Sequence, residues 1–277
     1  MTMTVTDPTV TIDQFSALPA TCGRGGGRSH DVYWRATDPS PLTDPATAHF
    51  AFRTVEPERT VNFGRKRLTF SFHSVRTGQV QQGEGPWELL LAKHLETTPD
   101  GGPYRLHGHR AWFTHDDGSV TTYGPDAVWT DADGHVVCGE VKASDGYFAE
   151  PATAALLAAA ERGLATAGIR LARITGNALC ADRRRRFNVC RAFADGLGRL
   201  DEHLEQQARD VLAGGSVSLA RLGERLEVDD ANRVRVLNSL LVRRVASYDL
   251  SAAITPDLEI SAARPIREGP LLESLTI

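Results

Sequence analysis

Three acidic residues and one lysine have the types and spacing that suit metal-assisted hydrolysis. Glu140 and Lys142 lie two positions apart, so on a β-strand their side chains project from the same face. Asp126 is separated from Glu140 by 13 residues, a span that one hairpin turn can fold back on itself. Glu88 lies upstream, on a predicted helix. We therefore expect the three carboxylates to converge on one point, with Lys142 beside them.

Carboxylates that crowd together repel each other unless a cation lies among them. Hard oxygen ligands favour Mg²⁺, with Mn²⁺ as the alternative, and Mg²⁺ also binds the phosphate groups of substrates. In such a site Lys142 can orient the attacking water or help to deprotonate it, and its charge can stabilise the transition state. The pattern predicts hydrolysis of a phosphate ester at a metal centre.

Each of these residues also has a purely structural interpretation. Glu88, about three positions into its helix, can serve in a capping box, and Asp126, which follows a proline, can shape a turn. Glu140 and Lys142 can form a pair on the surface of a sheet. The joint pattern favours a site, because the valines around Glu140 indicate a central strand, where charged side chains are seldom placed without a partner.

The order of the surrounding elements predicts a mixed α/β fold. A helix begins near Pro86, since proline suits the first helical position. Turn sequences at residues 116–118 and 131–134 favour antiparallel hairpins, and an alanine-rich crossover helix leads to a further strand. The predicted strands span residues 68–72, 104–114, 120–130, 135–142 and 169–175, and the alanine-rich helix spans residues 152–167.

The chain divides into three predicted regions. Residues 1–48 contain a glycine-rich run and closely spaced prolines, and we expect them to be poorly ordered. Residues 49–200 hold the predicted sheet and the candidate site. Residues 201–277 form a third region whose order of elements is typical of a winged-helix unit. Its predicted helices span residues 204–212, 219–226 and 231–245, and its predicted β-wing spans residues 245–260.

The composition is that of a globular protein, with 277 residues of which 41% are apolar and 24% charged, and with a net charge of −4. No apolar run approaches the ~18 residues that a membrane span needs, and the first residues lack the pattern of a signal peptide. The four cysteines have no zinc-binding spacing. We therefore expect a cytoplasmic protein with reduced thiols and no membrane partner.

Four consecutive arginines lie just beyond the last predicted strand of the sheet. They are Arg183, Arg184, Arg185 and Arg186. One interpretation is a charged loop in solvent. The alternative is a clamp for DNA phosphates, which would reconcile DNA binding with the acidic average of the chain.

Three histidines, His107, His109 and His115, raise the possibility of a zinc site. Two of them form an H-x-H pair on a predicted strand. The sequence offers no further cysteine or aspartate at ligand spacing, so this signal is weaker than the carboxylate pattern.

Together these motifs resemble a known nuclease core. The proline–aspartate pair at 125–126, the E-V-K triplet at 140–142 and the helical Glu88 resemble the PD-(D/E)xK nuclease superfamily. A closer resemblance is to the TnsA-type endonuclease subunit of heteromeric transposases. It is carried by GPWEL at 85–89, YGPD at 123–126, GEVK at 139–142 and RFN at 186–188. The resemblance covers about residues 71–194, with a looser match over the C-terminal helices.

The resemblance implies a restriction-endonuclease-like domain over residues 49–200 and a winged-helix-like domain after it. It implies that Glu88, Asp126 and Glu140 hold Mg²⁺, that the carbonyl of Val141 is a further ligand, and that Lys142 assists the attack of water. The implied reaction is hydrolytic cleavage of the non-transferred DNA strand near the 5′ ends of a transposon. The implied partners are the transposon ends, an integrase-type transposase subunit and an ATP-using regulator of transposition.

Two alternatives remain open. A stand-alone nuclease of the same superfamily, of the restriction or repair type, would cut DNA without a partner subunit. A non-catalytic DNA-binding regulator would use only the winged-helix region, and this interpretation leaves the group of Asp126, Glu140 and Lys142 unexplained.

Overall fold

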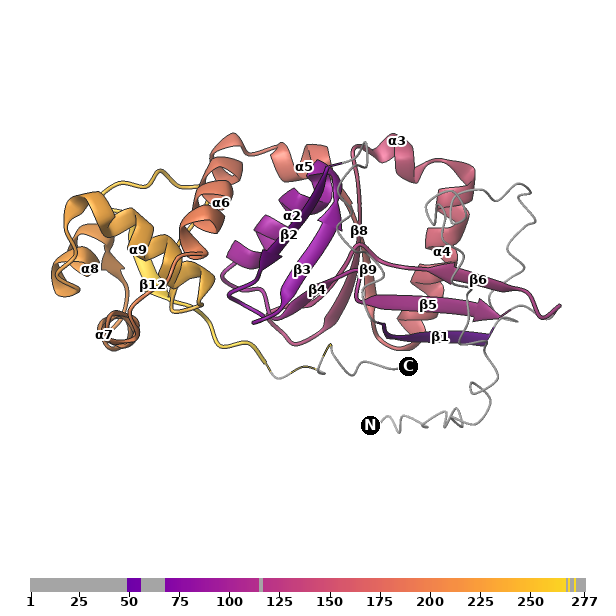
Figure 1. The fold of residues 1–277 in the computed structure, drawn as a ribbon, viewed down its shortest axis with the longest axis horizontal. Helices are drawn as coiled ribbons and strands as arrows, with labels where there is room; N and C mark the ends of the chain where they lie inside the picture. The colour runs from indigo at the N-terminus through magenta and orange to yellow at the C-terminus, as the bar shows by residue number, and fades with distance from the viewer. Residues whose placement is uncertain (1–48, 56–67, 115–116, 268, 270–271, 273–277) are drawn as a thin grey trace, which may run out of the picture. The chain divides into compact units, whose positions relative to one another are not determined.

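The sheet that carries the candidate residues has four strands of mixed direction (Figure 1). The structure is a computed structural model that describes residues 49–55, 68–114, 117–267, 269 and 272. The strand order is β4 (Tyr104–Leu106), β7 (Ala127–Thr130), β8 (Val136–Lys142) and β9 (Arg170–Thr175). β8 runs antiparallel to β7 and parallel to β9. The predicted mixed α/β class is confirmed.

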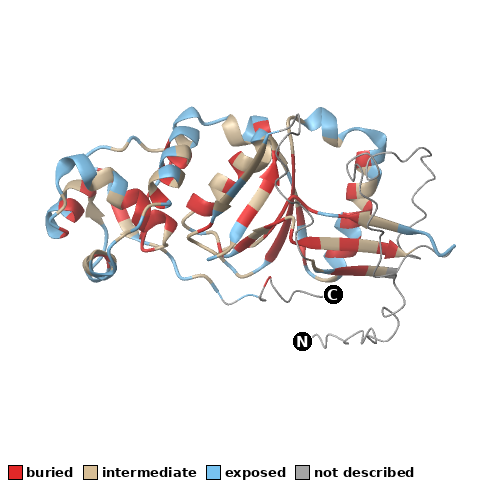
Figure 2. Ribbon diagram, in the orientation of Figure 1, coloured by how far each residue is buried: buried red, intermediate tan, exposed pale blue. Residues whose placement is uncertain are grey.

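Strand β8 is central, with hydrogen-bonded neighbours on both sides. Its residues 136–141 are all buried, and Figure 2 shows it in red along most of its length. A strand that is covered on both faces usually has a nearly continuous apolar sequence. The sequence of β8, VVCGEVK, is of this kind except for its two charged residues. The charges of Glu140 and Lys142 therefore lie at the end of a core strand.

A helical crossover joins β8 to β9, because two parallel strands cannot be connected by a tight turn. It consists of α3 (Asp145–Phe148) and α4 (Pro151–Thr166), the latter matching the predicted alanine-rich helix. Leu157 and Leu164 of α4 are at most 2% exposed and pack in one apolar cluster with Phe52 and Phe113. The cluster joins α4 to a second sheet.

The second sheet has the order β1 (His49–Thr54), β5 (His109–Thr114) and β6 (Val120–Tyr123), all antiparallel. The prediction of single strands over residues 104–114 and 120–130 is therefore wrong, because each segment is divided between the two sheets. The first break contains Gly108, where a Cβ would lie 2.2 Å from Nε of Arg105. The second contains Pro125, which has no N–H to donate to a sheet.

Helix α2 (Gly85–Thr97) follows a hairpin of β2 (Thr69–His73) and β3 (Val80–Glu84). A proline occupies its first turn, as predicted, and Gly85 adopts φ +83° where the strand turns into the helix. Leu91 of α2 is 4% exposed and packs in a cluster with residues of β4, β7 and β8. This packing holds the first turns of α2 close to the end of β8.

The C-terminal part is mainly helical and contains a small antiparallel sheet with the order β10-β12-β11. Aspartate or serine side chains accept N-terminal backbone hydrogen bonds at four of its helices, as good N-caps do. Its elements are α5 (Gly176–Cys180), α6 (Arg183–Gly196), α7 (Glu202–Ala213), β10 (Val217–Ser218), α8 (Leu219–Arg225), α9 (Asp230–Val242), β11 (Ala246–Ser247) and β12 (Glu259–Ala262).

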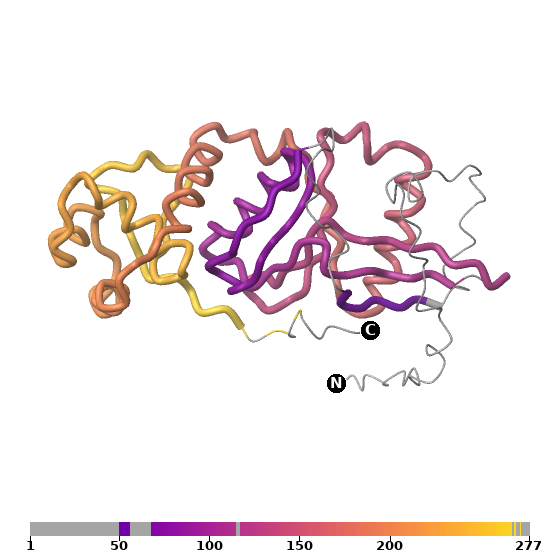
Figure 3. The backbone as a smooth tube through the Cα atoms, in the orientation of Figure 1, coloured from indigo at the N-terminus to yellow at the C-terminus, as the bar shows by residue number. Residues whose placement is uncertain are grey.

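These C-terminal elements share one apolar core, to which α6 contributes Val189 and Ala192. In Figure 3 the yellow C-terminal segment returns among the orange helices, where β12 pairs with β10 and β11. The described residues all fall in one compact unit, and a domain boundary near residue 200 stays a prediction. Residues 1–48, predicted to be poorly ordered, lie outside the described residues. No helix in the described ranges combines the length and apolar character that crossing a bilayer requires.

Candidate functional site

The β7–β8 hairpin brings Asp126 and Glu140 together. The register pairs Ala127 with Gly139, so Asp126, one residue before β7, lies across from Glu140. The two acidic residues are 8% and 2% exposed, respectively. Lys142 projects from the same face of β8 as Glu140, and its Nζ forms an ion pair with Glu140 Oε1. The structure thus places these three side chains side by side at the end of the central strand.

Helix α2 adds Glu88 to this group. Its Oε2 accepts a hydrogen bond of 2.8 Å from the backbone N–H of Glu84, the N-cap residue, so the capping interpretation describes one of its contacts. The same oxygen lies 2.7 Å from Nε2 of His107. A Cβ at Gly83 of β3 would lie 2.9 Å from this oxygen and 2.5 Å from the ring of Phe70, so β3 passes closely behind the carboxylate.

His107 is a site residue that the carboxylate pattern did not include. It lies in the break between β4 and β5 and adopts φ +50°, a conformation uncommon for residues other than glycine. Its backbone N–H donates to the carbonyl of Asp126 at 3.2 Å. The sequence signal for it was the H-x-H pair, which pointed to a zinc site with His109 rather than to the carboxylates.

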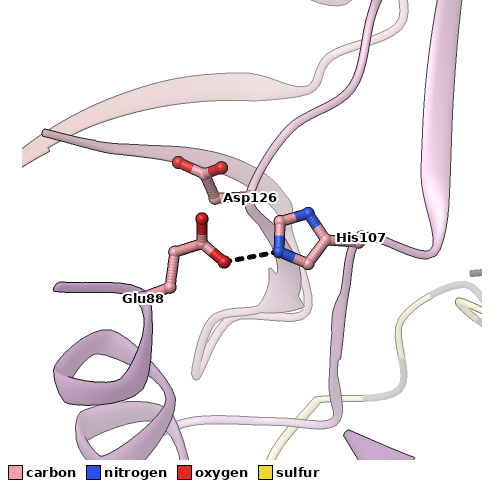
Figure 4. A group of neighbouring side chains, drawn as sticks. All are labelled: Glu88, His107 and Asp126. Carbon is pink, nitrogen blue, oxygen red and sulfur yellow. Dashed lines mark hydrogen bonds and ion pairs between the residues drawn. The ribbon is translucent and has the colours of Figure 1, made fainter. Parts of the chain in front are cut away.

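Glu88, His107 and Asp126 form a group that can hold a metal ion. One ligand atom from each lies within 4.8 Å of the others, and Figure 4 shows Glu88 and Asp126 next to each other with the imidazole bonded to Glu88. Asp126 is buried, and the other two residues are partly buried. Two carboxylates and one imidazole are a donor set that suits a divalent cation.

Glu140, also predicted as a metal ligand, is not a member of this group. Its Oε1 contacts Lys142, and its Oε2 accepts a hydrogen bond of 3.2 Å from the hydroxyl of Tyr123. The four predicted site residues therefore fall into two parts. Glu88 and Asp126 belong to the group that can hold a metal ion, and Glu140 and Lys142 form an ion pair next to it. A role for Glu140 as a ligand stays a prediction.

The buried carboxyl groups have perturbed acidities. Burial raises the pKa of Asp126, the nearby Glu88 carboxylate raises it further, and the charge of Lys142 opposes both. Burial likewise raises the pKa of Glu140, and the proximity of Asp126 adds to it. Burial alone would lower the pKa of Lys142, but the surrounding carboxylates outweigh it and raise that pKa. Ionised carboxylates are therefore disfavoured at this site, and a bound cation would relieve their repulsion.

Val141 lies between the two charged residues of β8. Its backbone N–H donates to Oδ2 of Asp126 at 2.8 Å, which fixes the orientation of this carboxylate against the sheet. The predicted role of its carbonyl as a metal ligand stays a prediction.

The four arginines begin α6 rather than forming a loop. Arg183, Arg184 and Arg186 are exposed, and Arg185 is partly buried. Asp182 caps the helix by accepting a hydrogen bond from the N–H of Arg185 at 2.9 Å. Positive charges at a helix N-terminus oppose the helix dipole, so helix stability does not explain them.

The other two histidines do not join the site. His109 is 1% exposed, stacks on Phe52 and places Nε2 2.9 Å from the carbonyl oxygen of Leu272. These contacts belong to the core. His115 lies outside the described residues.

A second group that can hold an ion lies at the turn between β7 and β8, formed by Asp131, Asp133 and His135. It is largely exposed. Burial raises the pKa of Asp131, but the backbone N–H groups of His135 and Asp133 that donate to its carboxylate, together with the charge of His135, outweigh burial and lower this pKa. These hydrogen bonds are those of an ordinary turn.

The comparisons with known proteins do not identify a family. No protein-family model matches the sequence, and no curated protein is significantly similar to it.

Proposed function

We propose that this chain is a divalent-metal-dependent DNA endonuclease. The observation that carries the proposal is the convergence of Glu88, Asp126, Glu140 and Lys142 from a helix, a hairpin and a central strand. The order of these residues along the chain is that of the PD-(D/E)xK pattern. The fold supports the same conclusion, because a mixed sheet with a helix before it and a crossover helix after the central strand is compatible with a restriction-endonuclease-like core.

In the proposed mechanism Glu88 and Asp126 would hold the cation, Mg²⁺ or Mn²⁺, and Glu140 lies next to Asp126. A divalent cation in such a site supplies charge stabilisation on a phosphate oxygen and activation of water. Lys142 is held at the edge of the group by Glu140, and its ammonium can donate a hydrogen bond to the attacking water. Tyr123 donates to the other oxygen of Glu140, so the ion pair keeps its orientation.

The arginines of α6 provide the proposed contact to DNA. They occupy the first turn of a helix, where backbone N–H groups also favour anions, and all but the partly buried Arg185 are exposed. A phosphate group of DNA would therefore meet both kinds of donor. This placement gives the positive charge a function that it does not have in helix stability.

The resemblance to the TnsA-type family extends the proposal to the biological reaction. The chain would cleave the non-transferred strand near the 5′ ends of a transposon, together with an integrase-type transposase subunit and an ATP-using regulator. The C-terminal helices α7, α8 and α9 with the sheet β10-β12-β11 would form a winged-helix-like domain. This domain would dock on a partner or on flanking DNA.

The experiment has two stages. Labelled transposon ends are first incubated with the chain and Mg²⁺ or Mn²⁺, with and without the partner transposase. Metal-dependent nicking of one strand supports the endonuclease, and its absence in both conditions contradicts it. A stand-alone nuclease would cut equally well without the partner.

The second stage compares products of complete reactions by sequencing their junctions. Asp126→Ala and Lys142→Ala should abolish the cut on the non-transferred strand while the partner still joins the other strand to a target. Products should shift from simple insertions to fused donor–target molecules. Asp133→Ala, an exposed aspartate on the same hairpin, should behave as the wild type. Loss of all joining would contradict the division of labour, and unchanged simple insertions would show that these residues do not cut.

A further inference from the structure

We propose that the imidazole of His107 is a direct ligand of the cation in the proposed nuclease site and makes that site selective for Mn²⁺ over Mg²⁺. The inference rests on the proposed function, because it concerns the same cation. It goes beyond the carboxylate pattern, in which every side-chain ligand is an oxygen.

The distances around His107 suit two ligands of one ion. In octahedral coordination with bond lengths of about 2.1 Å, neighbouring ligand atoms lie ~3 Å apart and opposite ones ~4.2 Å apart. Nε2 of His107 lies 2.7 Å from Oε2 of Glu88, close to the separation of neighbouring ligands. A carboxylate oxygen of Asp126 lies within 4.8 Å of a ligand atom of each of these residues. A small movement of these side chains can therefore place all three around one cation.

The backbone holds His107 in this position. Its φ of +50° carries a conformational cost that persists only where the surroundings impose it. Its N–H donates to the carbonyl of Asp126, and the preceding residue, Leu106, donates to the side chain of the buried Gln81 at 3.0 Å. The backbone of one proposed ligand is thus bonded directly to the backbone of another.

The short contact between His107 and Glu88 has a second interpretation, a simple hydrogen bond. In that case Nε2 carries a proton and donates it to the carboxylate, and His107 only positions Glu88. As a ligand, the same nitrogen presents its lone pair to the cation. The two roles predict different metal spectra.

The selectivity follows from ligand chemistry. Imidazole nitrogen suits transition metals, whereas Mg²⁺ prefers oxygen ligands and retains its waters. Loss of even an outer-sphere partner typically costs ~10–100-fold in metal affinity. Removing the imidazole should therefore weaken Mn²⁺ binding by at least about tenfold and weaken Mg²⁺ binding much less.

The test uses the full-length chain with Mn²⁺ and measures ¹⁴N coupling to the bound ion by pulsed electron paramagnetic resonance. The wild type should show coupling to a directly bound imidazole nitrogen. His107→Asn should abolish it, because asparagine also tolerates the left-handed backbone but lacks the imidazole. His135→Asn is the matched control, because His135 belongs to the second group that can hold an ion, and it should leave the coupling unchanged. Calorimetric titrations with Mn²⁺ and Mg²⁺ give the two affinities.

The outcomes separate this inference from the proposed function. Mn²⁺ that binds without ¹⁴N coupling, or coupling that survives in His107→Asn, overturns the role of His107 and leaves the nuclease in place. If Asp126→Asn binds Mn²⁺ as tightly as the wild type does, and likewise Mg²⁺, the proposed metal site itself is contradicted. Coupling that disappears only in His135→Asn assigns the nitrogen to the turn between β7 and β8. Circular dichroism of each variant verifies that it is folded.

Discussion

The crowding of carboxylates predicts that Asp126→Asn makes the metal-free protein more stable while it removes the proposed activity. Asp126 is buried beside Glu88 and across from Glu140, and the charges of Lys142 and His107 oppose this crowding only in part. Asparagine has nearly the same shape and keeps an oxygen to accept the N–H of Val141. The substitution therefore removes repulsion with little loss of packing or hydrogen bonding.

The magnitude follows from the separation of the charges. Two unit charges at most 4.8 Å apart repel by at least about 3.5 kcal/mol at an effective dielectric constant of ~20. The substitution also removes the attraction of Asp126 to Lys142 and to His107, and this loss offsets part of the gain. We expect a net gain of about 1–2 kcal/mol in the free energy of unfolding, or roughly 2–8 °C in melting temperature.

The gain should depend on pH. Because the pKa of Asp126 is raised, the folded protein holds this proton more tightly than the unfolded chain does, and wild-type stability falls as pH rises from the ordinary value of ~4 through the raised pKa. Asparagine does not titrate. The advantage of the variant should be small near pH ~5 and largest at pH ~8.

The assay is thermal unfolding with a chelator at both pH values, then with Mn²⁺. An ion at one hundred times its dissociation constant stabilises the wild type by about 2.7 kcal/mol and should stabilise the variant much less. Asp257→Asn, an exposed control with the same change of charge, should have little effect. An Asp126→Asn protein that is less stable than the wild type at pH ~8 without metal would refute the argument from repulsion.

Three other predictions concern DNA contact, the C-terminal part and the ion pair. Replacing Arg184 and Arg186 by alanine should flatten the log–log salt dependence of DNA affinity by about two units. An unchanged slope in fluorescence anisotropy would instead support the interpretation that they are charged residues in solvent without DNA contact. Arg244 donates to the carbonyl of Gly101 at 2.6 Å, so Arg244→Ala should lower the free energy of unfolding by about 1–2 kcal/mol. Arg244→Gly should lose ~1 kcal/mol less, because φ is +58° there; equal losses in urea denaturation would argue against backbone strain. Tyr123→Phe should slow cleavage by about 2–10-fold in single-turnover assays, and an unchanged rate would show that its hydroxyl does not position the ion pair.

The parts of the fold with strong local signals could be predicted from the sequence. Pro86 marked the start of α2, the alanine-rich stretch marked α4, and the turn at residues 131–134 marked the β7–β8 hairpin. The two-residue spacing of Glu140 and Lys142 was enough to place them on one face, because a strand has a fixed period. Each of these inferences depended on a few neighbouring residues.

The division of strands between two sheets could not be predicted in this way. Residues 104–106 and 109–114 both have strand-like sequences, and the change of sheet between them depends on partners distant in the chain, β7 for one and β1 for the other. Local patterns do not specify those partners. The same limit hid α6, whose four arginines have the local character of a solvent-exposed loop and whose helix is stabilised by packing against α9 and by the cap at Asp182.

The two breaks, at residues 107–108 between β4 and β5 and at residues 124–126 between β6 and β7, both contain residues of the candidate site. One break positions His107 and the other positions Asp126, and a backbone hydrogen bond joins them. In a regular strand, successive side chains point to opposite faces of the sheet. If residues 104–114 and 120–130 had continued as regular strands, the orientations of His107 and Asp126 would have been fixed by this alternation. Because the backbone is irregular at these two positions, the side chains of His107 and Asp126 do not follow the alternation of the sheet, although both residues stay next to its strands. Glu140 and Lys142, which stay on the regular strand β8, keep that period and pair with each other.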